Sequence, residues 1–286
     1  MYRNPAIGFI GFGEAGSNIA KGLRSEGLKR LFTFDIRDVR DRAAIHGTTV
    51  ADTPSALARS CDILISAVTA DSALDVASTF CPVLSPGKVF ADINSVSPAL
   101  KQQIGSTIQK SGAAFVEVAV MAPVPPHCHR VPLLINGDGA AQFAETMSAF
   151  GMRMEILPGK IGTAAAVKMC RSIVVKGLEA LLLECVISAS QYDAEDRVFA
   201  SLNESFPGLD WKKLANYMVG RVVLHGERRA HEMEEVAATL RSIGIDPIMA
   251  EATARRQAWS AGLDLKSHFG PDGPEGYQSV LDVINK

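Results

Sequence analysis

Short apolar segments alternate with amphipathic segments up to about residue 157 of the chain. The apolar segments, which predict β-strands, are 6–10, 31–34, 48–51, 63–68, 89–93, 115–120, 131–135 and 154–157. The segments between them predict helices, at 39–46, 55–59, 72–81, 97–112 and 140–150, with a further helix after Gly16. Strands that alternate with helices are typical of a parallel sheet, so this part of the chain predicts an α/β domain.

The pattern changes after Pro158. The sequence then predicts no strand but a series of helices, namely a long one over about 161–191, then 194–205, 211–223, 227–243, 247–263 and a short last one. The most apolar segment, 172–190, contains Lys176, Glu179 and Glu184, which favours a buried helix over a membrane span. We therefore predict a doubly wound α/β domain at 1–158 and an all-α domain at 159–286.

Composition narrows the class of protein. The chain has 286 residues, of which 47% are hydrophobic, enough for a substantial core, and its 29 basic and 31 acidic residues give a net charge of −2. This balance favours neither a nucleic-acid partner nor an anionic membrane. The five cysteines include no C-x-x-C pair and suit a reducing compartment. Because a predicted strand begins almost at once, without a secretory hydrophobic region, we expect a soluble cytoplasmic protein.

Three glycines follow the first predicted strand at the G-x-G-x-x-G spacing. Gly11 permits a tight turn, Gly13 lets the backbone approach a pyrophosphate, and Gly16 lets the next helix pack closely on the strand. The free N–H groups at the start of that helix then face the phosphates. The order of strand, turn and helix predicts a Rossmann-type dinucleotide site that also includes Phe12, Glu14 and Ala15.

The second predicted strand ends in Asp35, 19 residues after Gly16, where a carboxylate meets the adenosine ribose. A carboxylate at this position favours NAD, because it repels the 2′-phosphate of NADP. Arg37 lies two residues further on and offers the opposite interpretation, in which it holds that phosphate. We predict NAD as the cofactor and keep NADP open.

The start of the long helix carries a candidate basic site. Small residues fill the turn before Lys168, and Lys168, Arg171 and Ser172 share one helix face at positions i, i+3 and i+4. Two interpretations stay open from the spacing, a cleft or a solvated basic face. The segment 127–129, His-Cys-His, lacks the usual spacing of metal ligands, so it predicts a loop rather than a metal site.

The chain resembles the β-hydroxyacid dehydrogenase superfamily, which includes 3-hydroxyisobutyrate and 6-phosphogluconate dehydrogenases. Three segments carry the resemblance: 8–16 at the glycine turn, 92–98, similar to the family's D-x-S-T-x-x-P, and 162–168, similar to the start of its G-x-x-x-x-x-K-x-x-N-N. The resemblance implies a nicotinamide-dependent hydride transfer on a small-molecule substrate, with Lys168 as the catalytic acid/base, and a homodimer through the helical domain. It also implies that Val68 and Thr69 pass over the cofactor.

Two residues after the fifth predicted strand belong to the same expectation. By the resemblance, Asn94 and Ser95 lie near the nicotinamide. The alternative is a turn that only caps the following helix.

The substrate segments depart from the family. The family's D-A-P-V-S-G-G corresponds here to 117–123, with Met121 in place of the serine and Ala122 and Pro123 in place of the glycines, and Arg171 and Ser172 replace its asparagine pair. We therefore expect a larger or more apolar substrate than in the family, with an anionic group near Arg171. His231 corresponds loosely to a second family lysine, and a surface histidine is the alternative.

These features predict an NAD(P)-dependent oxidoreductase acting on a hydroxy acid or a related alcohol or carbonyl compound. An imine reductase is a second hypothesis, because related folds reduce C=N bonds, although Lys168 argues against it. A non-catalytic dinucleotide-binding module is a third, from the divergent substrate segment.

Overall fold

The computed structural model describes residues 4–285. The chain forms two compact units, Met1–Lys168 and Met169–Lys286. The division between these units falls inside helix α8 (Thr163–Ser190), and the domain boundary near residue 158 stays a prediction. The first turns of this helix therefore belong to the N-terminal unit.

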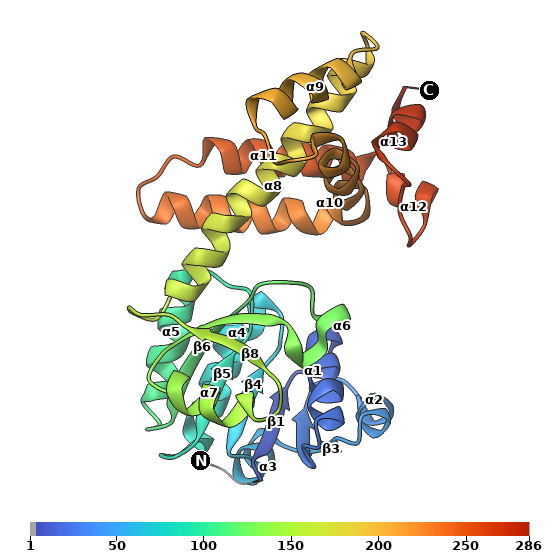
Figure 1. Cartoon of the computed structure of the whole chain (residues 1–286). Helices are drawn as coiled ribbons and strands as arrows, with labels where there is room; N and C mark the ends of the chain where they lie inside the picture. The colour runs from blue at the N-terminus through green and yellow to red at the C-terminus, as the bar shows by residue number, and fades with distance from the viewer. Residues whose placement is uncertain (1–3, 286) are drawn as a thin grey trace. The chain divides into compact units, whose positions relative to one another are not determined.

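The N-terminal unit is built on one sheet (Figure 1). Among the described residues its eight strands are β1 (Ala6–Ile10), β2 (Arg30–Phe34), β3 (Thr49–Val50), β4 (Ile63–Ser66), β5 (Val89–Asp92), β6 (Ala114–Val120), β7 (Pro132–Asn136) and β8 (Arg153–Ile156). Their order is β3-β2-β1-β4-β5-β6-β7-β8, in which only β6 and β7 pair antiparallel. The chain reverses its direction of winding between β1 and β4, the point at which sheets of this type bind ligands.

Side chains that alternate along each strand build one core layer on each face of the sheet. Ile7 and Phe9 face one layer, whereas Ile10 faces the other. The helices of the first layer are α1 (Glu14–Ser25), α2 (Arg40–Ile45) and α7 (Ala140–Ser148), and those of the second are α3 (Pro54–Ser60), α4 (Ala73–Phe80) and α5 (Pro98–Gln109). The predicted doubly wound sheet is confirmed.

Two local features of this unit depart from the simple alternation of strands and helices. The strand β7 runs antiparallel to β6, because the short connection between them has no room for a full crossover helix. That connection is not an open loop but holds the short helix α6 (Val124–His127) and the 3₁₀ turn η3 (Cys128–Arg130). Prolines at the start of α6 are compatible with helix, since the first turn needs no backbone N–H donors.

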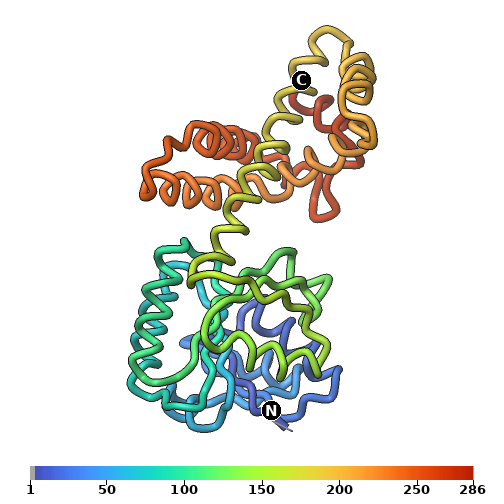
Figure 2. The backbone as a smooth tube through the Cα atoms, turned by 60° about the vertical axis from the view of Figure 1, so that its left-hand side comes forward, coloured from blue at the N-terminus to red at the C-terminus, as the bar shows by residue number. Residues whose placement is uncertain are grey.

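The C-terminal unit contains helices joined by turns and no strand among its described residues. Its elements are the rest of α8, α9 (Glu195–Ser205), α10 (Trp211–Ser242), α11 (Ile248–Gly262), α12 (Leu265–Phe269) and α13 (Tyr277–Ile284). The helices α10 and α11 run side by side, as Figures 1 and 2 show in orange. None of the helices described here has the length and apolarity to cross a membrane. The predicted all-α domain is confirmed.

One long helix replaces two predicted ones. We predicted a break between 223 and 227, but α10 is continuous through Gly226. A Cβ at Gly226 would lie 3.0 Å from the carbonyl oxygen of Gln257 in α11. The glycine thus allows close packing of two helices rather than ending one.

Candidate functional site

The glycine turn after β1 has one tight side and one open side. Gly11 has φ +83°, and a Cβ there would lie 2.5 Å from the carbonyl oxygen of Ala67. A Cβ at Gly16 would lie 2.6 Å from the carbonyl oxygen of Gly11. Gly13, by contrast, is exposed, and a Cβ on it would meet none of the described atoms within 4 Å. The turn therefore leaves free space beside Gly13, directly at the N-terminus of α1, where backbone N–H groups attract an anion.

Asp35 is held beside this turn. Its Oδ2 accepts a hydrogen bond from the Phe12 N–H at 2.7 Å, and its Oδ1 accepts one from the Arg37 N–H at 2.9 Å. Arg42 donates to the carbonyl oxygen of Phe12 at 3.0 Å. Each carboxylate oxygen keeps a further lone pair, so Asp35 can still accept hydrogen bonds from a ribose. The side chains of Glu14 and Arg37 are exposed.

A buried amide joins the loops that follow β4 and β5. Asn94 accepts a hydrogen bond from the Val68 N–H at 2.7 Å and donates to Ser66 Oγ at 2.9 Å and to Asp92. Thr69 and Ser95, its neighbours on the two loops, are exposed. The side chain of Asn94 thus holds the two loops together, and the exposed positions beside it are those open to a ligand.

A buried ion pair supports the same loops. Lys101, on α5, donates to the Asp92 carboxylate at 2.8 Å and to the Asp92 carbonyl oxygen at 2.7 Å. Both side chains are about 1% exposed. Lys101 was not among the predicted site residues. The signal for it in the sequence is an aspartate at the end of an otherwise apolar strand, because a buried carboxylate needs a buried partner.

A second buried carboxylate holds the start of α8. Glu117, on β6, accepts hydrogen bonds from the Gly162 N–H at 2.6 Å and the Ala165 N–H at 2.7 Å. Glu117 pairs in register with Asp92, the last residue of β5, so α8 begins near the carboxyl edge of the sheet. The glycine turn lies on the same edge after β1, three strand spacings away in the order β1-β4-β5-β6, which is about 14 Å. Lys168 follows Ala165 within the same unit.

The predicted substrate residues are distributed over both units. Met121, Ala122 and Pro123 follow the carboxyl end of β6, and the Met121 N–H donates to the Pro132 carbonyl oxygen at 2.9 Å. Arg171 and Ser172 continue the face of α8 that carries Lys168, and Arg171 is exposed.

His231 lies on α10 in the C-terminal unit and is exposed. Its neighbour Glu232 is occupied by ion pairs with Lys176 and Arg228, each at 2.8 Å. The structure thus brings the residues of the N-terminal unit to one sheet edge, whereas His231 belongs to a separate unit.

The core of the C-terminal unit contains buried charges. Glu179 is fully buried on α8 and pairs with Arg229 at 2.6 Å and with Arg221 at 3.3 Å, while Gln257 donates to it at 3.3 Å. Burial raises the pKa of Glu179, against the opposing effect of the two arginines. These groups hold α8, α10 and α11 together.

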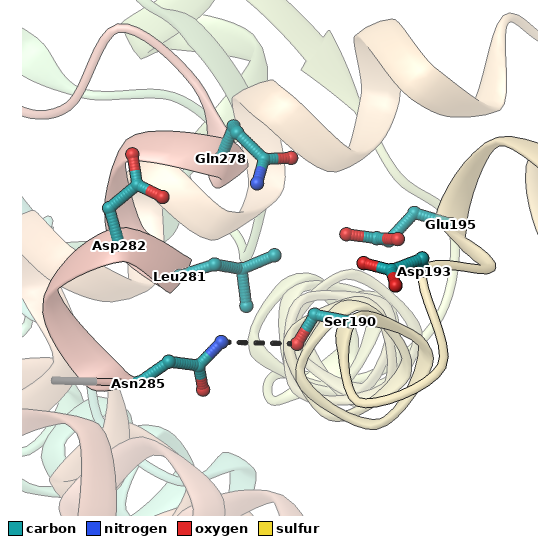
Figure 3. Close-up of a pocket in the computed structure, with 7 residues that line it drawn as sticks. All are labelled: Ser190, Asp193, Glu195, Gln278, Leu281, Asp282 and Asn285. Carbon is teal, nitrogen blue, oxygen red and sulfur yellow. Dashed lines mark hydrogen bonds between the residues drawn. The ribbon is translucent and has the colours of Figure 1, made fainter.

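A pocket of about 460 Å³ lies in the C-terminal unit (Figure 3). Its lining is mostly polar and comes from the end of α8, the turn into α9, the start of α9, and α13 with the residue after it: Ser190, Asp193, Glu195, Gln278, Leu281, Asp282 and Asn285. The lining includes none of the predicted site residues. Residues 4–285 contain no group of three or more His, Cys, Asp or Glu side chains placed to hold a metal ion.

Family models match both parts of the chain. Residues 6–124 match the NAD-binding domain of 6-phosphogluconate dehydrogenase. Residues 189–260 match a domain of unknown function (DUF1932). The N-terminal unit is therefore a domain that binds NAD or NADP.

Similar proteins extend over nearly the whole chain. A conserved hypothetical protein from Sinorhizobium meliloti is 37% identical, with 98% of this chain and 96% of that chain covered and a TM-score of 0.84. A conserved protein of unknown function, described as structurally similar to 3-hydroxyacid dehydrogenases, is 30% identical, with 92% and 97% covered and a TM-score of 0.78.

The chain is also similar to an enzyme of known activity. The mitochondrial 3-hydroxyisobutyrate dehydrogenase of Drosophila melanogaster is 26% identical over 211 residues, which are 72% of this chain and 64% of that enzyme. The chain thus matches somewhat less than two thirds of the enzyme's length. Together these similarities support an NAD(P)-dependent oxidoreductase.

Proposed function

Because the chain belongs to a divergent β-hydroxyacid dehydrogenase-like family, we propose that it transfers a hydride between a nicotinamide dinucleotide and a hydroxy acid or a related alcohol or carbonyl compound. The observation that carries this proposal is the free space beside Gly13 on the sheet edge where α8 begins. The glycine turn can bind the phosphates, and α8, which carries Lys168, begins on the same edge of the sheet. A dinucleotide bound along this edge would extend from the glycine turn toward the start of α8.

Residues along this edge would hold the dinucleotide. The N–H groups around Gly13 and the start of α1 suit the pyrophosphate, and Asp35 suits the adenosine ribose. The exposed positions Thr69 and Ser95 suit the nicotinamide end. We propose NAD rather than NADP, because the Asp35 carboxylate is fixed beside the turn and repels a 2′-phosphate. The bound cofactor supplies the hydride chemistry, and the protein orients it.

Lys168 is the proposed acid/base. When an alcohol is oxidised, the neutral amine takes the hydroxyl proton as the hydride leaves the carbon. In the reverse direction the ammonium gives its proton to the carbonyl oxygen. Support comes from the start of α8, which Glu117 anchors near the carboxyl edge of the sheet three residues before Lys168.

The substrate is proposed to be larger or more apolar than the small hydroxy acids of the family. Met121 and Pro123 offer apolar surface at the carboxyl end of β6, where the family has serine and glycine. Arg171, on the Lys168 face of α8, suits an anionic group of the substrate, with Ser172 beside it. The role of His231 stays a prediction.

We further propose a homodimer, which rests on the family resemblance. Ile243 and Ile245, between α10 and α11, and Ile248, the first residue of α11, are all at least half exposed, as is common where chains associate. Light scattering on the purified protein tests this proposal, and a monomeric mass would contradict it.

The experiment that tests the proposed function is a screen of alcohols, hydroxy acids and cyclic imines with NAD(H) and NADP(H), followed by absorbance of the reduced nicotinamide. With an alcohol substrate in hand, Lys168→Ala should lower turnover by about 10²- to 10⁴-fold and leave the dinucleotide Kd unchanged. Lys160→Ala, a change at an exposed lysine just before α8, is the matched control and should keep full turnover.

Other outcomes would contradict the proposal. Full turnover by Lys168→Ala would remove the acid/base role. Reduction of imines without any reaction of alcohols would favour an imine reductase, and tight dinucleotide binding without turnover of any compound would favour a non-catalytic module.

A further inference from the structure

We propose that Glu117 is a positioning residue, which fixes the first turn of α8 and thereby sets the location of the Lys168 amine. This inference rests on the proposed role of Lys168. Glu117 lies in the middle of β6, is fully buried, and contacts neither the glycine turn nor Asp35 through any of its described hydrogen bonds.

Both oxygens of the Glu117 carboxylate accept hydrogen bonds from backbone N–H groups at the start of α8. One accepts from the Gly162 N–H at 2.6 Å and the other from the Ala165 N–H at 2.7 Å. These N–H groups belong to the residue before α8 and to its third residue, and neither has a backbone acceptor within the helix. Gly162 has no side chain that caps the helix, so a carboxylate from a strand 45 residues earlier takes this role.

The charge of Glu117 suits this task. The N-terminus of a helix carries a partial positive charge, and a buried carboxylate that accepts two N–H bonds there is stabilised by that charge. The path of the chain also leaves little freedom, because Gly162 has φ +101° and a Cβ on it would lie 3.0 Å from the Pro98 carbonyl oxygen. The start of α8 is thus held from two sides.

The position of Lys168 follows from this anchor. It lies three residues beyond Ala165 in an unbroken helix, a rise of about 4.5 Å. Ala164 and Ala165 are buried, so the first turn is packed inside the protein rather than exposed to solvent. Any shift of this turn is passed on to the lysine, and a misplacement of about 1 Å can cost a hundredfold in rate.

Neighbouring contacts keep the chain in place when Glu117 is changed. Gln102 donates to the Ile161 carbonyl oxygen at 3.0 Å, and Asn136 donates to the carbonyl oxygens of Leu157 and Gly159 at 2.8 and 3.2 Å. Variants of Glu117 therefore retain the connection into α8, and the change is confined to its first turn.

The test compares Glu117→Gln and Glu117→Asp with the matched control Asp138→Asn. The amide keeps the size of the glutamate but turns an NH₂ group toward one backbone N–H, while aspartate keeps the charge but is too short to reach both donors. Asp138 accepts from the Phe115 N–H at 2.8 Å near the start of β6, so its variant disturbs the same strand away from α8.

We expect Glu117→Gln to lower kcat by 10- to 100-fold per molecule that binds dinucleotide, with the dinucleotide Kd unchanged. Glu117→Asp should lose less, and Asp138→Asn should keep the wild-type kcat. Wild-type kcat in both Glu117 variants, or an equal loss in Asp138→Asn, would overturn the proposal. If Glu117→Gln does not fold, Glu117→Asp gives the same comparison.

A second measurement separates this proposal from the role of Lys168. Reductive ¹³C-methylation makes the Lys168 amine visible by NMR, and Lys168→Arg identifies its signal. The Glu117 variants should shift that signal and its titration, while Asp138→Asn should not. If Lys168→Ala keeps full turnover but Glu117→Gln still shifts the signal, the proposed function fails and the positioning by Glu117 stands. An unchanged signal contradicts the positioning.

Discussion

The two units of the chain use buried charge in different ways. In the N-terminal unit, two carboxylates accept hydrogen bonds from backbone N–H groups at the ends of elements: the half-buried Asp35 holds the glycine turn, and the fully buried Glu117 holds the start of α8. In the C-terminal unit, the buried Glu179 serves other side chains, Arg221 and Arg229, in the centre of a helical core. The first arrangement shapes a surface for a ligand, and the second ties helices to one another.

This difference indicates where each unit tolerates change. A carboxylate that accepts from backbone N–H groups fixes local geometry, so its loss should be felt first in binding or rate. A buried carboxylate that pairs with arginines balances charge inside a core, so its loss should lower stability first. Variants in the two units test this contrast.

Glu179→Ala should lower the free energy of unfolding by about 3–5 kcal/mol, because it leaves the buried Arg229 guanidinium, and the partly buried Arg221 beside it, without their counter-charge. Urea denaturation followed by circular dichroism measures this loss. The control is Glu184→Ala on the same helix, where an exposed carboxylate pairs with Arg256 and the expected loss is at most about 1 kcal/mol. Equal losses in the two variants would contradict the stabilising role of the buried cluster.

A matched pair of changes in the glycine turn should separate folding from binding. Gly16→Ala places a Cβ against the Gly11 carbonyl oxygen and should cost about 1–3 kcal/mol of stability. Gly13→Ala meets no described atom within 4 Å, so it should keep its stability but raise the dinucleotide Kd by at least about tenfold, or 1.4 kcal/mol, by occupying the space meant for the pyrophosphate.

Denaturation and a fluorescence titration with NADH measure the two effects. If Gly13→Ala binds NADH as tightly as the wild type, the phosphates do not bind in the space beside Gly13.

The smallest expected effect is a pH dependence of stability in the C-terminal unit. Burial, with nearby arginines and Lys266, lowers the pKa of His225 to about 4. Between this value and the ordinary pKa of about 6.5 the unfolded chain binds a proton that the folded chain does not, so stability falls as the pH drops through this window. Because His225 is partly exposed, we expect a loss of about 1–2 kcal/mol between pH 7 and pH 4.

His225→Asn should make the stability less dependent on pH over this window, as measured by thermal unfolding at a series of pH values. The same slope in variant and wild type would assign the pH dependence to other groups.

Local signals in the sequence predicted the sheet and the glycine turn. Apolar runs of strand length and the spacing of Gly11, Gly13 and Gly16 depend only on neighbouring residues, and the structure places these elements as predicted. The continuous α10 was not predicted, because Gly226 suggests a break until its packing against α11 is known.

Contacts between distant residues were beyond the sequence pattern. Glu117 and Gly162 are 45 residues apart, and nothing near either residue indicates the other. Asp92 and Glu117 are both charged residues within apolar strands. Such a residue indicates that a buried partner exists, but it does not identify that partner. Asn94 is a second example of a contact that the sequence does not reveal. Its position after β5 was predicted, but its side chain forms hydrogen bonds with Ser66 and Val68, which lie more than 25 residues earlier in the chain.

The most direct test of the central proposal is the pH profile of kcat for the wild type and for Lys168→Ala, with the alcohol that the screen identifies and saturating dinucleotide. An amine that takes up the hydroxyl proton should appear in the wild type as an ionisation below which oxidation slows. We predict that Lys168→Ala lacks this ionisation and is slower at every pH, whereas two profiles with the same ionisation and similar rates would contradict the account.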